Sequence, residues 1–154
     1  MNTTMSSDDV PVNVKGVFIG ETRAGSVPIV LLEDDEEAIM PIYIGPSEAV
    51  SIHMALKNEI PPRPLTHDLF VSLIENIEYE IQKIVIDELK QNIYYAKMIL
   101  ENENRCFELD ARPSDCIAIA IRTGIPIFVN NKVFTESTTT IEDLGELRMM
   151  DDLT

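Results

Sequence analysis

The chain has 154 residues, which is enough for one domain with a real core and too few for two ordinary domains. Hydrophobic residues make up 45% and charged residues 25%, values typical of soluble globular proteins, so a wholly disordered chain is excluded. No apolar run is long enough to span a membrane, and the first residues lack the basic start and apolar segment of a secretory signal. We therefore expect a cytoplasmic protein with no membrane partner.

The net charge of −15, from 27 acidic and 12 basic residues, is unfavourable for binding nucleic acid. No stripe rich in lysine or arginine occurs, so the basic face by which a general nucleic-acid binder releases counterions is missing. The run Glu33–Glu37 is wholly acidic and is expected to be a solvated hairpin tip. Any contact with a polyphosphate must be weak and local, or must use a bound metal cation to offset the repulsion.

Two cysteines, Cys106 and Cys116, stand apart in the sequence without a CxxC pair. Their number and spacing indicate neither a disulfide framework nor a zinc site. Both side chains are expected to pack as small hydrophobic groups.

In chain order, the first part of the sequence predicts three strands and a helix. β-Branched and apolar residues favour the strands, while Pro46 and Glu48 are typical of a helix start. Pro28 and Pro41 cannot donate to a ladder, so their strands are expected to be edge-like or bulged there. The predicted strands cover residues 12–19, 27–32 and 38–44, and the predicted helix covers residues 46–58.

The second part begins after a proline-rich break at residues 59–64. A helix over 65–77 is indicated by an apolar stripe at helical spacing, made of Leu69, Phe70, Leu73, Ile74 and Ile77. A further helix, over 113–123, is apolar on nearly every side, so it should be buried and should end at Gly124. The elements predicted here are strands over 79–89, 93–101 and 105–111, the buried helix over 113–123, and a short strand over 126–129.

Two segments of the chain, residues 44–52 and 111–119, align without gaps at an offset of 67 positions. Each follows a three-strand block and opens a helix with proline, serine and an acid. The predicted fold is therefore α+β, with two antiparallel three-strand blocks each followed by a helix, an internal pseudo-repeat whose helices pack on mixed sheets. This domain is predicted over residues 12–136, between a disordered arm of residues 1–11 and an acidic flexible tail of residues 137–154 with a short helix over 141–149.

The strongest candidate for chemistry lies at the start of the buried helix, at Asp110, Arg112, Ser114 and Asp115. One interpretation is a cap, in which Ser114 and Asp115 satisfy free helix N–H groups and Arg112 pairs with an aspartate. The other is a functional site, in which the carboxylates hold a hard divalent cation and Arg112 clamps a phosphate. The residue types leave both interpretations open.

A second candidate follows the proline-rich break, at Arg63, Thr66, His67 and Asp68. These residue types bind an anion or supply a general base in one interpretation. In the other they form a cap, with Thr66 or His67 at the N-cap and Asp68 favoured by the helix dipole.

Three further polar residues are weaker candidates. His53 falls in line with apolar positions of its helix and is expected to be packed or at an interface. Asp87 and Glu88 are either a polar strand end or further carboxylates facing the same cleft. The sequence contains no Walker loop, no GxGxxG and no GxSxG, which disfavours P-loop nucleotide hydrolysis and serine hydrolase chemistry.

The motifs around these candidates occur together and in order, at residues 42–49, 61–69 and 110–115. In them the chain resembles the bifunctional nuclease (DNase/RNase) family of bacteria, archaea and plants, over roughly residues 14–136. The resemblance implies a compact α+β domain, usually oligomeric, with nuclease activity on DNA and RNA attributed to some members. The positions it marks as a site are Glu48, Arg63, Thr66, His67, Asp68, Asp110, Arg112, Ser114 and Asp115.

The first hypothesis is therefore a nuclease of little sequence specificity. We expect Mg²⁺ or Mn²⁺ to be held by Asp110, Asp115 and Glu48. His67 with Asp68 is expected to deprotonate water, while arginines of the motifs receive the scissile phosphate. The residues expected to act in catalysis are Asp110, Asp115, His67, Asp68 and Arg112, and those expected to bind substrate are Arg63, Thr66 and Ser114.

The second hypothesis is a non-catalytic, self-associating module that binds a small anionic ligand or a protein partner. It is favoured by the position of the motif residues at helix starts, where caps are common, and by the acidic charge. In either case we expect a homodimer or larger homo-oligomer, because the apolar strands and the all-apolar helix exceed what one small domain covers.

Overall fold

A computed structural model of the chain describes residues 9–150 and has the predicted α+β class. Within these residues there are eight strands, four α-helices and one 3₁₀ turn. The strands are β1 (Asp9–Thr22), β2 (Gly25–Glu33), β3 (Ile39–Tyr43), β4 (Glu80–Lys90), β5 (Ile93–Glu101), β6 (Cys106–Ala111), β7 (Ile127–Asn130) and β8 (Leu147–Met149). The helices are α1 (Pro46–Leu56), α2 (Thr66–Asn76), α3 (Pro113–Thr123) and α4 (Asn131–Ser137), and the 3₁₀ turn is η1 (Glu142–Leu144).

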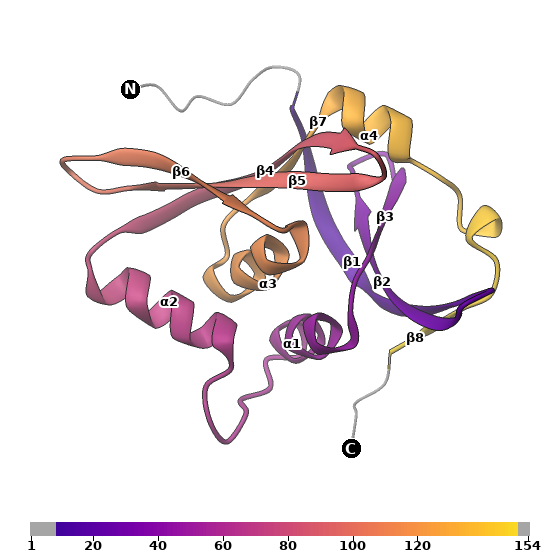
Figure 1. Ribbon diagram of the computed structural model, residues 1–154, viewed down its shortest axis with the longest axis horizontal. Helices are drawn as coiled ribbons and strands as arrows, with labels where there is room; N and C mark the ends of the chain where they lie inside the picture. The colour runs from indigo at the N-terminus through magenta and orange to yellow at the C-terminus, as the bar shows by residue number, and fades with distance from the viewer. Residues whose placement is uncertain (1–8, 151–154) are drawn as a thin grey trace.

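The two antiparallel three-strand blocks are confirmed as β1–β2–β3 and β4–β5–β6. They are joined by β7, which pairs antiparallel with β1 and parallel with β4. The result is one continuous mixed sheet in the order β3-β2-β1-β7-β4-β5-β6, with β8 added on β1 (Figure 1). The pseudo-repeat thus folds as two halves of a single sheet.

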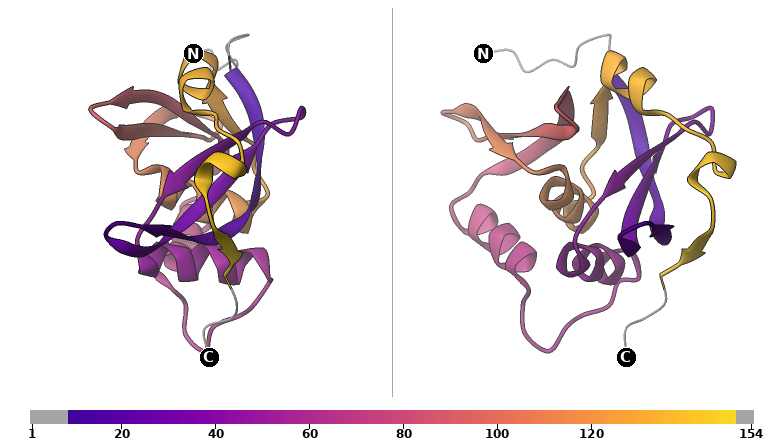
Figure 2. Two further views of the ribbon diagram at one scale, coloured as in Figure 1. Left: turned by 90° about the vertical axis from the view of Figure 1, so that its right-hand side faces the viewer. Right: turned by 45° about the vertical axis from the view of Figure 1, so that its right-hand side comes forward.

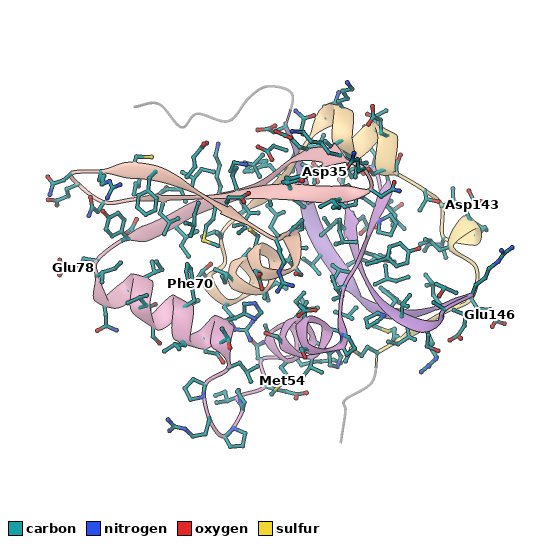
Figure 3. The ribbon with its side chains drawn as sticks, viewed as in Figure 1. Asp35, Met54, Phe70, Glu78, Asp143 and Glu146 are labelled. Atoms are coloured by element: carbon teal, nitrogen blue, oxygen red, sulfur yellow. The ribbon has the colours of Figure 1, made fainter. Side chains whose placement is uncertain are left out.

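The main core lies between the sheet and α1, α2 and α3, which gather on one side of the β4–β5–β6 block (Figure 1). As predicted, α3 is buried, and it packs against α1, α2, β4 and β5. The stripe on α2 behaves differently: Ile74 is buried and Phe70 packs against the core, at the position labelled in Figure 3, whereas the other three apolar residues are exposed. Most of the apolar stripe of α2 therefore faces away from the core.

The two prolines meet the prediction in different ways. Pro41 lies in β3, an end strand of the sheet order, but Pro28 lies in β2, which has a neighbour on each side. Pro28 is tolerated because it stands where the β2–β3 ladder ends, just beyond the pair Ile29–Tyr43.

The chain ends also differ from the prediction. Residues 9–11, expected in the disordered arm, begin β1 and pair with β7, while residues 1–8 and 151–154 lie outside the described residues. In the expected tail, the helix over 141–149 shrinks to η1, and β8 returns to pair with β1, as Figure 2 shows in yellow. Leu147 of β8 packs against a second apolar cluster, made of Ile29, Leu31 and Ile39. The burial of this apolar side chain favours the return of β8 to the sheet. None of the helices in residues 9–150 has the length and hydropathy needed to cross a bilayer.

Candidate active site

Three helix starts converge on one hollow with a volume of about 480 Å³. Proline at the first position of α1 and of α3 supplies the fixed φ angle that opens a helix. The pseudo-repeat places an acid at the same point of each first turn, so both acids reach the hollow. The polar residues used below are Glu48 and Ser51 of α1, Thr66 and His67 of α2, and Arg112 and Asp115 at the start of α3.

His67 bridges α1 and α3 through both of its ring nitrogens. Its Nε2 lies 2.8 Å from Oδ1 of Asp115, and its Nδ1 lies 2.6 Å from Oγ of Ser51. Arg112 donates from Nε and Nη2 to the two oxygens of Asp115, at 2.8 and 3.0 Å. The same guanidinium lies 3.8 Å from Glu48. The carboxylate of Asp115 is thus shared between an imidazole and an arginine.

The hydrogen bonds decide the charge of Asp115. Burial raises the pKa of its carboxyl group, but the hydrogen bonds and charges of Arg112 and His67 lower it by more, so the net shift is downward. Asp115 is therefore ionised at neutral pH and accepts the proton on Nε2 of His67. Such a carboxylate orients an imidazole and stabilises its protonated form.

A second network fastens α2 to the other two helices. Arg122, in the last turn of α3, donates to Oδ1 of Asp68 at 2.7 Å, to Oγ of Ser51 at 3.0 Å and to the carbonyl oxygen of Ala118 at 2.9 Å. The other oxygen of Asp68 accepts the N–H of Leu65 at 2.8 Å. Burial raises the pKa of Asp68, but these two partners outweigh it and the net shift is downward. Asp68 thus braces the start of α2, while the carboxylate bonded to His67 is Asp115.

Two residues of this site, Ser51 and Arg122, were not predicted from the sequence. Arg122 has the position of an ordinary basic residue in a last helical turn, so nothing marked it. Ser51 carried one signal: it is a hydroxyl on the apolar face of a helix, where a buried polar group needs a partner.

The predicted carboxylates do not all meet at the hollow. The side chain of Asp110 is 76% exposed and lies 3.8 Å from Lys97 of β5. Lys97 lies at the same distance from Asp87, so these residues form a separate cluster across β4, β5 and β6. Glu88 pairs with Lys90 at 2.8 Å.

The remaining predicted residues occupy three environments. Thr66 lines the hollow, Arg63 is exposed in the proline-rich bend, and Ser114 is buried. The capping interpretations differ in detail from the structure: Leu65 is the N-cap of α2, and α3 has no side-chain hydrogen bond at its N-cap, although Arg112 does pair with an aspartate.

The predicted metal ligands do not form a common donor set in this structure. Glu48 and Asp115 both turn toward Arg112, whereas Asp110 faces Lys97. Within residues 9–150, no group of three or more His, Cys, Asp or Glu is placed to hold a metal ion. We therefore assign no step of the chemistry to a metal, and metal dependence stays a prediction.

The hollow has the parts of an acid–base centre for an anionic substrate. An imidazole paired with an ionised carboxylate transfers protons. Arg112, whose side chain is 63% exposed, pairs with Asp115 through Nε and Nη2, and its remaining N–H groups are available to donate to phosphate oxygens. The helix starts around it favour negative charge.

Comparison with known proteins identifies the family of the chain. Residues 29–142 match the family described as bifunctional nuclease domain. An uncharacterized protein of Mycobacterium tuberculosis is 36% identical over 133 residues, which cover 86% of this chain and 78% of that protein. The chain belongs to the bifunctional nuclease domain family.

Plant relatives carry the family name. Bifunctional nuclease 1 of Oryza sativa subsp. indica is 30% identical over 108 residues, covering 68% of this chain and 33% of the relative. Bifunctional nuclease 1 of Arabidopsis thaliana is 29% identical over 121 residues, covering 77% and 37%. The matched part of the chain thus spans about a third of the length of these plant proteins.

Proposed function

We propose that the chain is a nuclease that hydrolyses phosphodiester bonds of DNA or RNA with little sequence specificity. The observation that carries the proposal is the position of His67, which lies in one hollow with an ionised carboxylate behind it and Arg112 beside it. The plant relatives named as bifunctional nucleases support the same reaction class.

The residues of the hollow divide the reaction between them. Arg112 receives the scissile phosphate and offsets the charge that develops on its oxygens. His67 acts as general base toward water, and Asp115 stabilises the imidazolium that results. Thr66 lies beside His67 in the lining, where a hydroxyl can hydrogen-bond a phosphate oxygen.

The charge of the chain supports weak and local contact with nucleic acid. The net charge is −15, and the cation of the hollow is the single Arg112. Few counterions are released by one arginine, so affinity must come from the site and not from an extended basic groove. Base sequence is not read by such a contact, because phosphates are the same at every position.

The test is cleavage of fluorescent single-stranded DNA and RNA oligonucleotides by the full chain, with Mg²⁺, with Mn²⁺ and with EDTA. We expect His67→Gln and Asp115→Asn each to lower kcat by about 10²- to 10⁴-fold, the range that general base catalysis contributes. Glu75→Gln, on the exposed side of α2, is the matched control and should cleave like the wild type. Melting temperatures show whether the variants are folded.

Two results contradict the proposal: a wild type that cleaves nothing under any of these conditions, or a His67→Gln variant that keeps wild-type kcat. Loss of cleavage in EDTA supports the predicted metal dependence. Full cleavage in EDTA contradicts the predicted metal dependence but not the proposed nuclease activity.

We also propose that two copies associate through the exposed apolar stripe of α2, which consists of Leu69, Leu73 and Ile77. These side chains are between 50% and 65% exposed, although they repeat at the spacing of one helical face. The expectation of an oligomer rested on the apolar strands and the all-apolar helix. That helix, α3, is buried inside the chain, whereas the stripe of α2 is exposed. In an antiparallel contact Leu73 meets its own copy and Leu69 meets Ile77, the self-complementarity that a two-fold interface requires.

The second candidate function is a non-catalytic module that self-associates and binds a small anionic ligand. The exposed stripe of α2 favours it, together with the saturated hydrogen bonds of Asp115. The oligonucleotide assay separates the two candidates, because a module binds without cleaving.

A further inference from the structure

The hydrogen bonds around His67 leave one arrangement of protons when His67 is neutral. Asp115 is an ionised acceptor and cannot donate, so Nε2 of His67 carries the ring proton. Nδ1 is then an unprotonated acceptor, and the group within 2.6 Å of it is the hydroxyl of Ser51. Ser51 therefore donates its proton to His67.

Arg122 fixes the direction of this hydrogen bond. Its Nη2 lies 3.0 Å from Oγ of Ser51, and a guanidinium only donates. Oγ therefore accepts from Arg122 and keeps its own proton for His67. A hydroxyl oxygen has two lone pairs, so one remains to accept a proton from a water in the hollow that Ser51 lines.

Packing alone does not require a hydroxyl at this position. Ser51 is 5% exposed, and the equivalent position in the other half of the pseudo-repeat is Ala118 of α3, which is fully buried. An alanine thus suffices at the equivalent point of the other half. The hydroxyl is present where His67 approaches, and it lies at the only ring nitrogen of His67 that is free to take up a proton.

We propose that Ser51 is the proton relay between the hollow and His67, an inference that rests on the proposed nuclease reaction. Water transfers a proton to Oγ of Ser51 while Ser51 transfers its own proton to Nδ1 of His67. The resulting hydroxide forms a bond to phosphorus, and the bond from phosphorus to the leaving oxygen breaks. That oxygen takes a proton from solvent water, and His67 later returns its extra proton to solvent through Ser51.

The kinetic test compares Ser51→Ala with Ser51→Thr, which restores a hydroxyl, and with Ser47→Ala, which removes a hydroxyl from the same lining one turn earlier. We expect Ser51→Ala to lower kcat at least about 100-fold with little change in KM, and Ser51→Thr to recover kcat to within about tenfold. Ser47→Ala should match the wild type. In mixtures of H₂O and D₂O, the rate of the wild type should fall along a curve, because two protons move together, and that of Ser51→Ala along a straight line.

The second test needs no cleavage. The chain has two histidines, so ¹⁵N resonances of His67 are assigned by comparison with His67→Gln. At alkaline pH the wild type should carry its ring proton on Nε2, and Nδ1 should move downfield in Ser51→Ala and stay in place in Ser47→Ala.

A ring proton on Nδ1 of the wild type overturns the relay, and so does wild-type kcat in Ser51→Ala. If the wild type cleaves nothing, the nuclease proposal and the relay as a catalytic step fail together. The NMR result still decides whether Ser51 donates to His67.

Discussion

At the scale of single residues, Asp87 is a partly buried carboxylate that lowers the stability of the fold, because its hydrogen bonds and ion pairs do not fully compensate its burial. One of its oxygens is buried without a hydrogen-bond partner among the described residues, and its nearest cation, Lys97, is 3.8 Å away. Burial raises the pKa of Asp87, and Lys97 reverses only part of that shift. The charged form is therefore less favourable in the folded than in the unfolded chain, and this cost applies above the folded pKa and disappears below the unfolded one.

Asp87→Asn should accordingly raise the free energy of unfolding at pH 7 by about 0.5–1 kcal/mol, a small gain because the side chain is partly solvated. Urea unfolding measures it, and the gain should vanish below about pH 3.9, where a free aspartate is protonated. Asp35→Asn, at the exposed tip between β2 and β3, corrects for the general relief of removing one charge from an acidic protein. A loss of stability in Asp87→Asn, after this correction, would show that the carboxylate is stabilising.

The residues of the hollow could be predicted from the sequence better than their pairings. Arg112 and Asp115 stood out because polar side chains crowd the start of an otherwise apolar helix, and His67 because it opens a helix after a proline-rich break. Asp68 was expected beside His67 because it is the next residue, yet successive helical residues point in different directions. The real partner, Asp115, lies 48 positions away, and only the packing of α2 against α3 brings it there.

At the scale of elements, α2 is held by two kinds of contact: Phe70 and Ile74 pack on the core, and the first turn is bonded to α3. Asp68 joins it to α3 through Arg122, whereas most of its apolar stripe is exposed. The net shift of the pKa of Asp68 is downward, so its contribution to stability is complete above the pKa of a free aspartate. The contribution is lost as the pH falls through the folded value.

Asp68→Asn should lower the free energy of unfolding by about 1–2 kcal/mol at pH 7, the range for a hydrogen bond to a charged group after allowance for solvent. The difference from the wild type should shrink as the pH approaches 3. Urea unfolding at both pH values checks this, with Glu75→Gln as the control on the same helix. An equal difference at both pH values would mean that the charge of Asp68 does not contribute.

Local sequence signals predicted most of the helices and strands. The segments that were predicted wrongly are those whose structure depends on pairing with distant strands. The prolines at the starts of α1 and α3 and the glycine after α3 set boundaries that the structure confirms within a few residues. By contrast, β8 and the first residues of β1 form only because distant strands, β1 and β7, offer them an edge. Nothing in the local composition of these segments indicates that edge.

At the scale of the whole molecule, the proposed contact between copies must overcome mutual repulsion. Each chain carries a net charge of −15, so two copies repel at low ionic strength, and salt should screen this repulsion and favour the dimer. The attraction is apolar and much less sensitive to salt. Light scattering on the wild type at tens of micromolar should therefore give a mass that rises toward twice that of the chain as salt is added.

Leu73→Asp, at the centre of the stripe, should reduce that mass to one chain at every salt concentration, because it places two carboxylates opposite each other in the contact. Ile93→Asp is the matched control, since Ile93 is 56% exposed, close to the 53% of Leu73, but lies at the β4–β5 turn. This control adds the same charge and should keep the wild-type mass. A wild type that stays monomeric, or equal effects of the two substitutions, would place the association elsewhere or remove it.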